Sequence, residues 1–345
     1  MEDNRKFNNF DLLRFLFAAT VAVCHAAILS KLAIFVWLWE YLSASVAVDS
    51  FFVISGFLIF RSFDFSHSLT SYLGKRVRRI FPGYAAVVVL CGILFFFVSS
   101  KGLSGYFNSE LLEYIFFNLL TLNFLQPTLP GVFEESALHF VNASLWTIKV
   151  EVMFYLSVPI ISFLISKINK VFAILVIYIG SIVYSVTMAE LSLSSNQEIF
   201  LTLEKQLPGQ LAYFISGAAI YYFFDSFYKT AIPLFIASVV VLFLHKYLID
   251  LSFLYPAALA VIVIFFAYKF KYLGNFGKYG DFSFGIYIWH FPIIQLLGHF
   301  NLFSNQLLGT LLLLVSVGSM AFLSWHLIEK KFLAKSSHYI IVGKN

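Results

Sequence analysis

The chain contains few charged residues and only two cysteines. Charged side chains make up 12% of its 345 residues, against about 25% in soluble domains, while 60% of the residues are hydrophobic. Hydrophobic runs recur from one end to the other, which predicts a single integral-membrane domain over residues 1–345 without an attached soluble module. Cys24 and Cys91 both fall in apolar segments, so a disulfide framework and a cysteine metal site are excluded, and no metal is expected.

Two signals that would direct the chain elsewhere are also missing. The first apolar segment contains Arg14 and is not followed by a small-residue cleavage site, so no cleavable signal peptide is expected. The net charge of +5 is carried by loops that belong to one membrane face, which does not indicate binding to nucleic acid. The remaining expectation is a multi-pass protein in contact with membrane lipids.

Eleven apolar segments are candidates for membrane helices. They lie near residues 10–30, 46–60, 81–99, 110–125, 145–166, 171–189, 209–224, 231–246, 251–268, 282–300 and 306–328. Lys and Arg gather before the first segment, in four of the connecting loops and after the last segment. The positive-inside rule therefore places both termini in the cytoplasm.

Termini on the same side require an even number of crossings, so one of the eleven segments does not cross. The loop 126–144 contains two Glu and neither Lys nor Arg, and it is expected outside. Segment 110–125 is therefore predicted to re-enter the membrane or to lie at its interface. The predicted fold is an all-α, polytopic transmembrane helical bundle with about ten crossings, in which residues 330–345 form a cytoplasmic tail.

The first segment carries two unusual residues on one helical face. Arg14 and His25 are eleven residues apart, so a helix turns them to the same side and separates them by about 16 Å along its axis. An Arg inside a spanning helix costs on the order of 2.5–3.5 kcal/mol, which favours a functional role. Arg14 alone could equally extend to the cytoplasmic headgroups. His25 titrates near neutral pH, which suits a general base or a nucleophile.

The second segment holds Asp49 near its outer end and Ser55-Gly56-Phe57 at its middle. Asp49 could contact His25 across helices or cap a helix N-terminus. Ser55 could contact substrate, but small residues also let helices approach closely, so packing is the simpler reading of Ser55-Gly56.

A basic cluster follows, with Arg76 and Arg79 one helical turn apart. Such a cluster next to a membrane is usually a topology signal or a contact with anionic lipids. Its functional alternative is a cytoplasmic clamp for phosphate groups, which lies below Arg14.

Two later segments add polar residues within apolar surroundings. Trp146, Lys149 and Glu151 lie at the outer end of the fifth segment, and a buried Glu151 needs a partner or a role. His290 lies in the tenth segment, where Pro292 frees backbone acceptors near it.

These stretches together resemble acyltransferase family 3, the membrane O-acetylases of bacterial surface polysaccharides and their relatives. The matching pieces are DLLRFLFAATVAVCH, VDSFFVISGFLIF, KRVRRIFPGY, SLWTIKVEVMFYLSVP and FSFGIYIWHFPI. They occur in the family's order over roughly residues 8–330, without the extracytoplasmic domain that many relatives carry.

The resemblance implies an acyl-CoA donor, usually acetyl-CoA, and a sugar hydroxyl as acceptor, in the bacterial inner membrane. It implies that His25 is catalytic, that Arg14, Arg76 and Arg79 bind the donor, and that Glu151 matches the family's acidic position. We further expect Asp49 or Glu151 to orient His25, and Ser55, Trp146, Lys149 and His290 to contact substrate. Lys149 departs from the family pattern and would favour an anionic acceptor.

The predicted reaction is therefore transfer of an acetyl group from cytoplasmic acetyl-CoA to a lipid-linked or surface glycan, such as lipopolysaccharide O-antigen. A transporter or flippase for a lipid-linked glycan is the rival class, since it would also place charges in the membrane. The same chemistry with another acyl group or acceptor is a third possibility, because acceptor specificity lies in loops.

Overall fold

Every predicted apolar segment contains a helix in the computed structural model, which describes residues 8–334, 337 and 339. The described residues form helices and no strand. The longer helices are α1 (Phe10–Ser30), α3 (Ala44–Asp64), α4 (Leu69–Leu94), α6 (Ser109–Leu119), α7 (Trp146–Lys167), α8 (Lys170–Ser195), α10 (Leu207–Tyr222), α11 (Phe224–Tyr247), α12 (Tyr255–Tyr268), α13 (Phe282–His299) and α14 (Gln306–Leu323). Short helices are α2 (Ala33–Trp39), α5 (Leu103–Tyr106), α9 (Ile199–Glu204), α15 (Lys330–Phe332), the 3₁₀ turns η2 (Phe95–Val98), η3 (Ala143–Leu145) and η4 (Leu302–Ser304), and the π-helical η5 (Ser324–Glu329).

Seven helical stretches among the described residues are long and apolar enough to cross a membrane. They contain α1, α3, α4, α7, α8, α11 and α14, and the other predicted crossings coincide with α10, α12 and α13. The all-α membrane fold is confirmed, whereas the number of crossings and the side of each terminus stay predictions. Helix α6 has 11 residues and spans about 16 Å, roughly half a hydrocarbon core, and the expectation that segment 110–125 does not cross stays a prediction.

The chain divides into two compact units, each assembled from separate stretches of sequence. Unit 1 contains the described residues of 8–13, 48–73 and 150–274. Unit 2 contains those of 14–47, 74–149 and 275–339. All of the predicted arginines and both predicted histidines therefore fall in unit 2.

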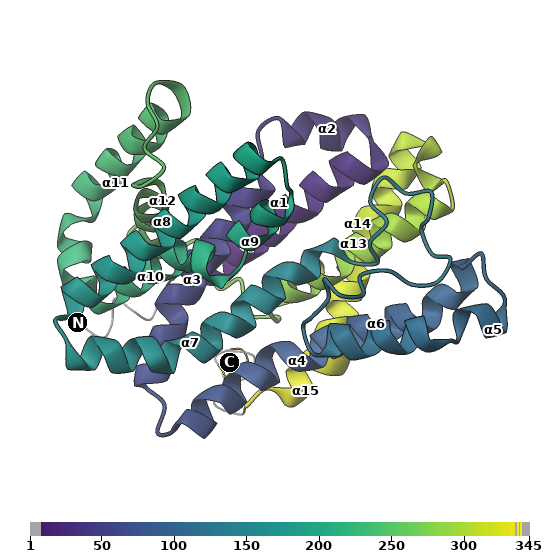
Figure 1. Cartoon of the computed structure of the whole chain (residues 1–345), viewed down its shortest axis with the longest axis horizontal. Helices are drawn as coiled ribbons and strands as arrows, with labels where there is room; N and C mark the ends of the chain where they lie inside the picture. Colours follow the sequence, from purple (N-terminus) through teal and green to yellow (C-terminus); the bar gives the residue numbers. More distant parts are fainter. Residues whose placement is uncertain (1–7, 335–336, 338, 340–345) are drawn as a thin grey trace. The chain divides into compact units, whose positions relative to one another are not determined.

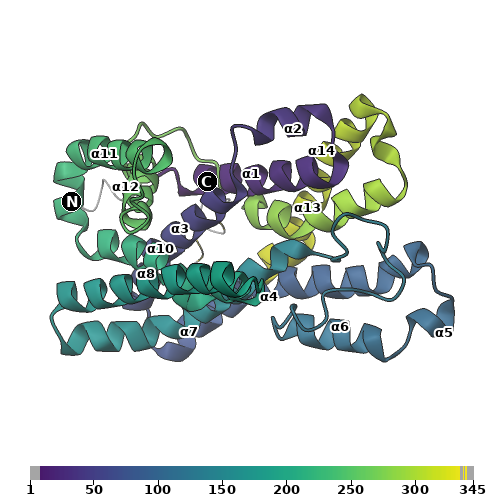
Figure 2. The same ribbon diagram turned by 45° about the horizontal axis from the view of Figure 1, so that its top comes forward.

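Within unit 1, α8 packs on α10, and α11 lies beside α12 (Figure 2). Helices α3 and α10 touch backbone to backbone through two glycines. A Cβ on Gly56 would lie 1.8 Å from the carbonyl oxygen of Phe214, and one on Gly217 would lie 2.1 Å from that of Val53. This close crossing explains Gly56 by packing.

Within unit 2, α13 packs on α14, and α4 lies alongside α6 (Figure 1). The Tyr84 hydroxyl of α4 donates a hydrogen bond of 2.7 Å to the backbone oxygen of Asn118, near the end of α6. The Asn118 amide in turn donates to the backbone oxygen of Gln126, at 2.9 Å. The irregular backbone after α6 is thus satisfied by protein groups, which burial in an apolar environment requires.

Candidate functional site

Helices α1 and α13 meet at two histidines in unit 2. The Nδ1 atom of His25 lies 2.8 Å from Nε2 of His290. The two rings are stacked, with centroids 5.1 Å apart and an interplanar angle of 10°. His290 is completely buried, whereas His25 is half-buried and therefore the more accessible of the two.

The contacts of His290 determine which ring nitrogens carry protons. Its Nδ1 atom lies 3.0 Å from the backbone oxygen of Ile286, which only accepts hydrogen bonds, so Nδ1 must be protonated. In a neutral ring Nε2 is then an acceptor, and the hydrogen bond with His25 must be donated by His25 Nδ1. The neutral His25 ring consequently keeps its lone pair on Nε2. That atom is the base or nucleophile that this pair offers.

The start of α7 and the turn before it hold His290 in place. Pro292 has no N–H, so the carbonyl oxygen of Ile288 loses its helical donor. The side chain of Asn142 supplies one, donating to this oxygen at 2.8 Å. Asn142 also caps η3 and accepts from the backbone N–H of Ser144, whose hydroxyl lies 3.2 Å from His290 Nε2. The backbone oxygen that Pro292 leaves without a helical donor therefore binds Asn142, and this bond holds the turn that contains Ser144 against His290.

The N-terminal ends of the same two helices carry a cluster of opposite charges. Asp281 is hydrogen-bonded to Arg79 of α4 and lies 4.0 Å from Nη1 of Arg14. Glu329 lies 3.9 Å from Nη1 of Arg79 and accepts a hydrogen bond of 2.7 Å from Ser324. The carboxylate side chains are 2% and 1% exposed, whereas those of Arg14 and Arg79 are 24% and 19% exposed. Tyr339 contacts both guanidinium groups: Nη1 of Arg14 donates to its hydroxyl at 2.8 Å, and the guanidinium of Arg79 lies 5.3 Å from its ring centroid.

Asp281 also begins α13. Its side chain accepts from the backbone N–H of Ser283 at 3.1 Å and from the Ser283 hydroxyl, as an N-cap residue does. Burial raises the pKa of Asp281, but the charges of Arg79 and Arg14 and the bond from Ser283 outweigh burial and lower the pKa to about 2. One ionised carboxylate thus fixes the start of α13 and two guanidinium groups at once.

Contacts at two levels show that α1 and α13 run in the same direction within unit 2. Arg14 lies near Asp281 at the first level, and His25 contacts His290 at the second. The levels are about 16 Å apart along α1 and about 13 Å along α13. The charged cluster and the histidine pair therefore lie along one helix pair, about three helical turns apart.

The remaining predicted residues of unit 2 lie on α4 and α7. Arg76 is half-buried and precedes Arg79 by one turn of α4. Trp146 is half-buried at the first position of α7. The ammonium of Lys149 lies 4.5 Å from the ring centroid of Phe124, a cation–π contact that holds its charge on an aromatic face.

Three predicted residues belong to unit 1. Asp49 is hydrogen-bonded to Tyr213, and Glu151 accepts a hydrogen bond from Tyr155 one turn along α7. Ser55 lies beside the close crossing of α3 and α10. The predicted roles of Asp49 and Glu151 in orienting His25, and of Ser55 in binding substrate, stay predictions. The group that unit 2 itself supplies to His25 Nδ1 is His290, which we expected to contact substrate.

Sequence reasoning missed Asp281, Glu329 and Ser144. Asp281 had a readable signal, because an Asp two residues before a Ser at the start of an apolar run is a helix N-cap pattern. Glu329 contacts Ser324 nearby but also Arg79 far away in sequence, and the sequence carries no signal for that distant contact. Ser144 has no signal in the sequence, because its contact with His290 depends on how the loop before α7 folds.

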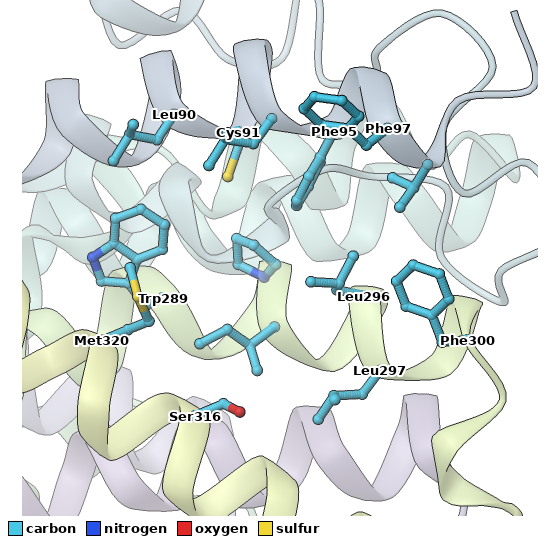
Figure 3. Close-up of a pocket in the computed structure, with 14 residues that line it drawn as sticks. Leu90, Cys91, Phe95, Phe97, Trp289, Leu296, Leu297, Phe300, Ser316 and Met320 are labelled. Carbon is cyan, nitrogen blue, oxygen red and sulfur yellow. The ribbon is translucent and has the colours of Figure 1, made fainter.

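An apolar pocket of about 410 Å³ lies among α4, α13 and α14 (Figure 3). Cys91 of α4, Trp289 of α13 and Met320 of α14 line it, and Trp289 directly precedes His290 in the chain. The indole Nε1 of Trp289 has no hydrogen-bond partner within the described part of the chain. Its nearly all-apolar walls suit a hydrocarbon group.

The chain is similar to known acyltransferases over almost its full length. The model of acyltransferase family 3, described as an acyltransferase domain, matches residues 7–329. An O-acetyl transferase of Shigella phage Sf6 is 26% identical over 346 residues, which covers 96% of this chain and 98% of the relative. Nodulation protein 10 of Rhizobium leguminosarum bv. viciae is 30% identical over 168 residues, 45% of this chain and 44% of the relative. No solved structure matches the chain significantly.

Proposed function

The chain belongs to acyltransferase family 3 and is an O-acyltransferase, and we propose that it moves an acetyl group from acetyl-CoA to a hydroxyl of a surface glycan. The observation that carries the proposal is the contact of His25 with His290 on two helices that have Arg14 and Asp281 near their N-terminal ends. Acetyl transfer from a CoA thioester needs a base at the reacting hydroxyl and cations at the donor's phosphates. Both kinds of group lie along one helix pair.

Arg14, Arg76 and Arg79 are the proposed binding groups for the CoA phosphates. A guanidinium binds phosphate oxygens through paired N–H donors and stays charged at all relevant pH values. Asp281 and Glu329 are buried and orient the guanidinium groups, while Arg14 and Arg79 are partly exposed. In this arrangement the phosphates stay at the N-terminal end of α1, and the pantetheine arm extends along the helix toward His25.

His25 Nε2 is the proposed proton acceptor. As the sugar hydroxyl oxygen attacks the thioester carbonyl carbon, Nε2 takes the hydroxyl proton, and His25 becomes an imidazolium. The C–S bond then breaks, and the CoA sulfur takes the proton from His25. His290 accepts from His25 Nδ1–H throughout, so it fixes the tautomer and stabilises the positive charge on the ring.

The same lone pair would serve a two-step reaction. His25 Nε2 would attack the thioester carbon, release the CoA thiolate and carry the acetyl group to the sugar hydroxyl. Trapping of an acetylated enzyme with labelled acetyl-CoA in the absence of glycan separates this route from direct transfer. Either route requires the Nε2 lone pair that the His25–His290 contact leaves available.

The bacterial inner membrane is the proposed location, because acetyl-CoA is made inside the cell and surface glycans are assembled on membrane lipids. The proposed acceptors are therefore lipid-linked or surface polysaccharides, including lipopolysaccharide O-antigen. This assignment is supported by the seven helical stretches suited to crossing a membrane.

The test is incubation of membranes containing the protein with radiolabelled acetyl-CoA and alkali-treated glycan from the expressing cells. We expect label in the glycan with the intact protein and with His67→Ala, an exposed histidine in the turn before α4, but not with His25→Ala. Absence of label with the intact, inserted protein and every glycan and acyl-CoA offered would overturn the proposal and favour a glycan transporter.

A further inference from the structure

A second and larger pocket lies at the C-terminal ends of α1 and α13, away from the arginines. Its volume is about 940 Å³. Leu29 and Ile294 line it, and they follow His25 and His290 by one helical turn each. The lining of the pocket therefore begins about 6 Å along the helix axes from the histidine pair. Arg14 lies about 22 Å from Leu29 along α1, so the pocket and the arginine cluster flank the histidines on opposite sides.

The wall of the pocket is built from a loop that is tied to α13. The Ser136 hydroxyl donates to Oε1 of Gln295 at 2.6 Å, and Nε2 of Gln295 donates to the backbone oxygen of Phe140 at 2.9 Å. On the other side, the Ser99 hydroxyl donates to the backbone oxygen of Pro130 at 2.6 Å. These bonds hold residues 130–140 against α13 and η2, so hydrogen bonds within the protein fix this wall of the pocket.

The groups that reach into this pocket suit hydroxyl-rich ligands. Glu134 and Glu135 are exposed, and their carboxylates accept hydrogen bonds from hydroxyl groups. Gln295 and the serine hydroxyls, whose donors are used within the protein, add acceptor oxygens, and Phe133 contributes an aromatic ring to the lining. A volume of about 940 Å³ lies at the upper end of the range for ligand sites, so it accommodates more than one sugar ring.

The charge of the pocket lining affects which classes of sugar can bind there. Its lining contains two carboxylates, Glu134 and Glu135, against one lysine, Lys31, which follows α1, and the imidazole of His299 at the end of α13. A net negative lining repels an acidic sugar and tolerates an uncharged or a cationic one. Lys149, which suggested an anionic acceptor from the sequence, is not part of this lining and packs on Phe124 instead.

We infer that this pocket is the acceptor site and that it takes a neutral or amino sugar presented next to His25. The inference rests on the proposed function and names the acceptor class of that same reaction. A sugar in the pocket would direct one hydroxyl past Leu29 toward Nε2 of His25, while acetyl-CoA approaches from the arginine end. Donor and acceptor would thus reach the base from opposite ends of α1.

Cysteine labelling tests the site directly, because the two native cysteines are buried. Ala137→Cys places a thiol in the pocket lining, and Tyr41→Cys places a matched exposed thiol in the turn after α2. The purified full-length variants are treated with a small charged methanethiosulfonate, with and without alkali-treated neutral glycan. We expect glycan to slow modification of Ala137→Cys at least about threefold and to leave Tyr41→Cys unaffected. Equal rates with and without glycan would overturn the inference.

A kinetic comparison tests the sugar class. Glu134→Gln with Glu135→Gln is expected to raise the KM for a neutral glycan at least about tenfold, since two hydrogen bonds to charged groups are weakened. The KM for acetyl-CoA should not change, and the control Glu110→Gln with Glu113→Gln on α6 should match the parent protein. An unchanged acceptor KM, or a preference of the parent for a uronic-acid glycan, would contradict the assignment.

The two proposals fail differently. If acetyl-CoA labels no glycan but glycan still protects Ala137→Cys, the pocket binds sugars and the transferase proposal is wrong. If acetyl transfer occurs but glycan does not protect Ala137→Cys, the transferase stands and the acceptor pocket is elsewhere.

Discussion

Replacing His290 should slow catalysis without weakening donor binding. His290 Nε2 accepts the hydrogen bond from His25 Nδ1 at 2.8 Å, and its own Nδ1 is held by Ile286. When His25 takes a proton, this bond becomes a hydrogen bond from a charged donor. Such bonds contribute about 1.5–3 kcal/mol, and each 1.4 kcal/mol corresponds to about tenfold in rate. His290→Leu, which fills the site but cannot accept, should therefore lower kcat by about 10- to 150-fold.

The assay is steady-state transfer of labelled acetyl groups to glycan by the purified protein. The KM for acetyl-CoA should stay near the parent value, because Arg14 and Arg79 lie at the other end of the helix pair. His290→Gln is the matched variant, since its amide oxygen can accept from His25 Nδ1, and we expect it to recover most of the lost rate. Unchanged kcat in inserted His290→Leu would refute the reasoning. Equal losses in Leu and Gln variants would show that His290 acts through packing alone.

Three further outcomes concern stability. Gly56→Ala should destabilise unit 1 by about 1–3 kcal/mol, because the added Cβ would lie 1.8 Å from the Phe214 carbonyl oxygen. The control is Gly180→Ala, whose added Cβ would have no atom within 4 Å and should leave thermal unfolding in detergent unchanged. Asp281→Asn should lower the free energy of unfolding by about 2 kcal/mol or more, because the ion pairs lower the pKa of Asp281 from 3.8 to about 2. The control Asp250→Asn, at an exposed side chain, should lower the free energy of unfolding only slightly. Because the folded pKa of Asp281 is below its ordinary value, its stabilisation is present above pH 3.8 and is lost as pH falls through about 2. The stability difference between the parent and Asp281→Asn should therefore decrease as the pH falls from 3.8 toward about 2, and a difference that does not change over this range would contradict the ion-pair assignment.

The sequence predicts the helices and the Arg14–His25 face because both depend on local periodicity. Eleven residues on one helix determine a common face from helix geometry alone, whatever the rest of the chain does. Pro292 likewise predicts a freed acceptor, and the carbonyl of Ile288 is bound by Asn142. The helices and the Arg14–His25 face depend on residues a few helical turns apart, and the unpaired carbonyl depends on the chemistry of proline alone, so the sequence is sufficient to predict them.

The partners of those residues could not be predicted, because they are distant in sequence. His25 and His290 are 265 positions apart, and Arg79 and Asp281 are 202 apart. Periodicity identifies a polar residue in an apolar helix but not the helix that it faces. Asp49 or Glu151 is still predicted to orient His25, as a carboxylate orients histidine in a catalytic triad, but the sequence gives no sign that unit 2 itself places a second imidazole at His25. The charge of the loop 126–144 can be read from the sequence. The pocket that the loop helps to form cannot, because it depends on hydrogen bonds between the loop and Gln295.

The most direct test of the account is the kcat of His25→Ala in purified, correctly inserted full-length protein, with labelled acetyl-CoA and alkali-treated glycan. A general base or nucleophile at this position predicts a loss of about 10²- to 10⁴-fold, with the KM for acetyl-CoA little changed. Retention of the parent kcat would contradict the role of His25 Nε2, and with it the mechanism built on the His25–His290 pair.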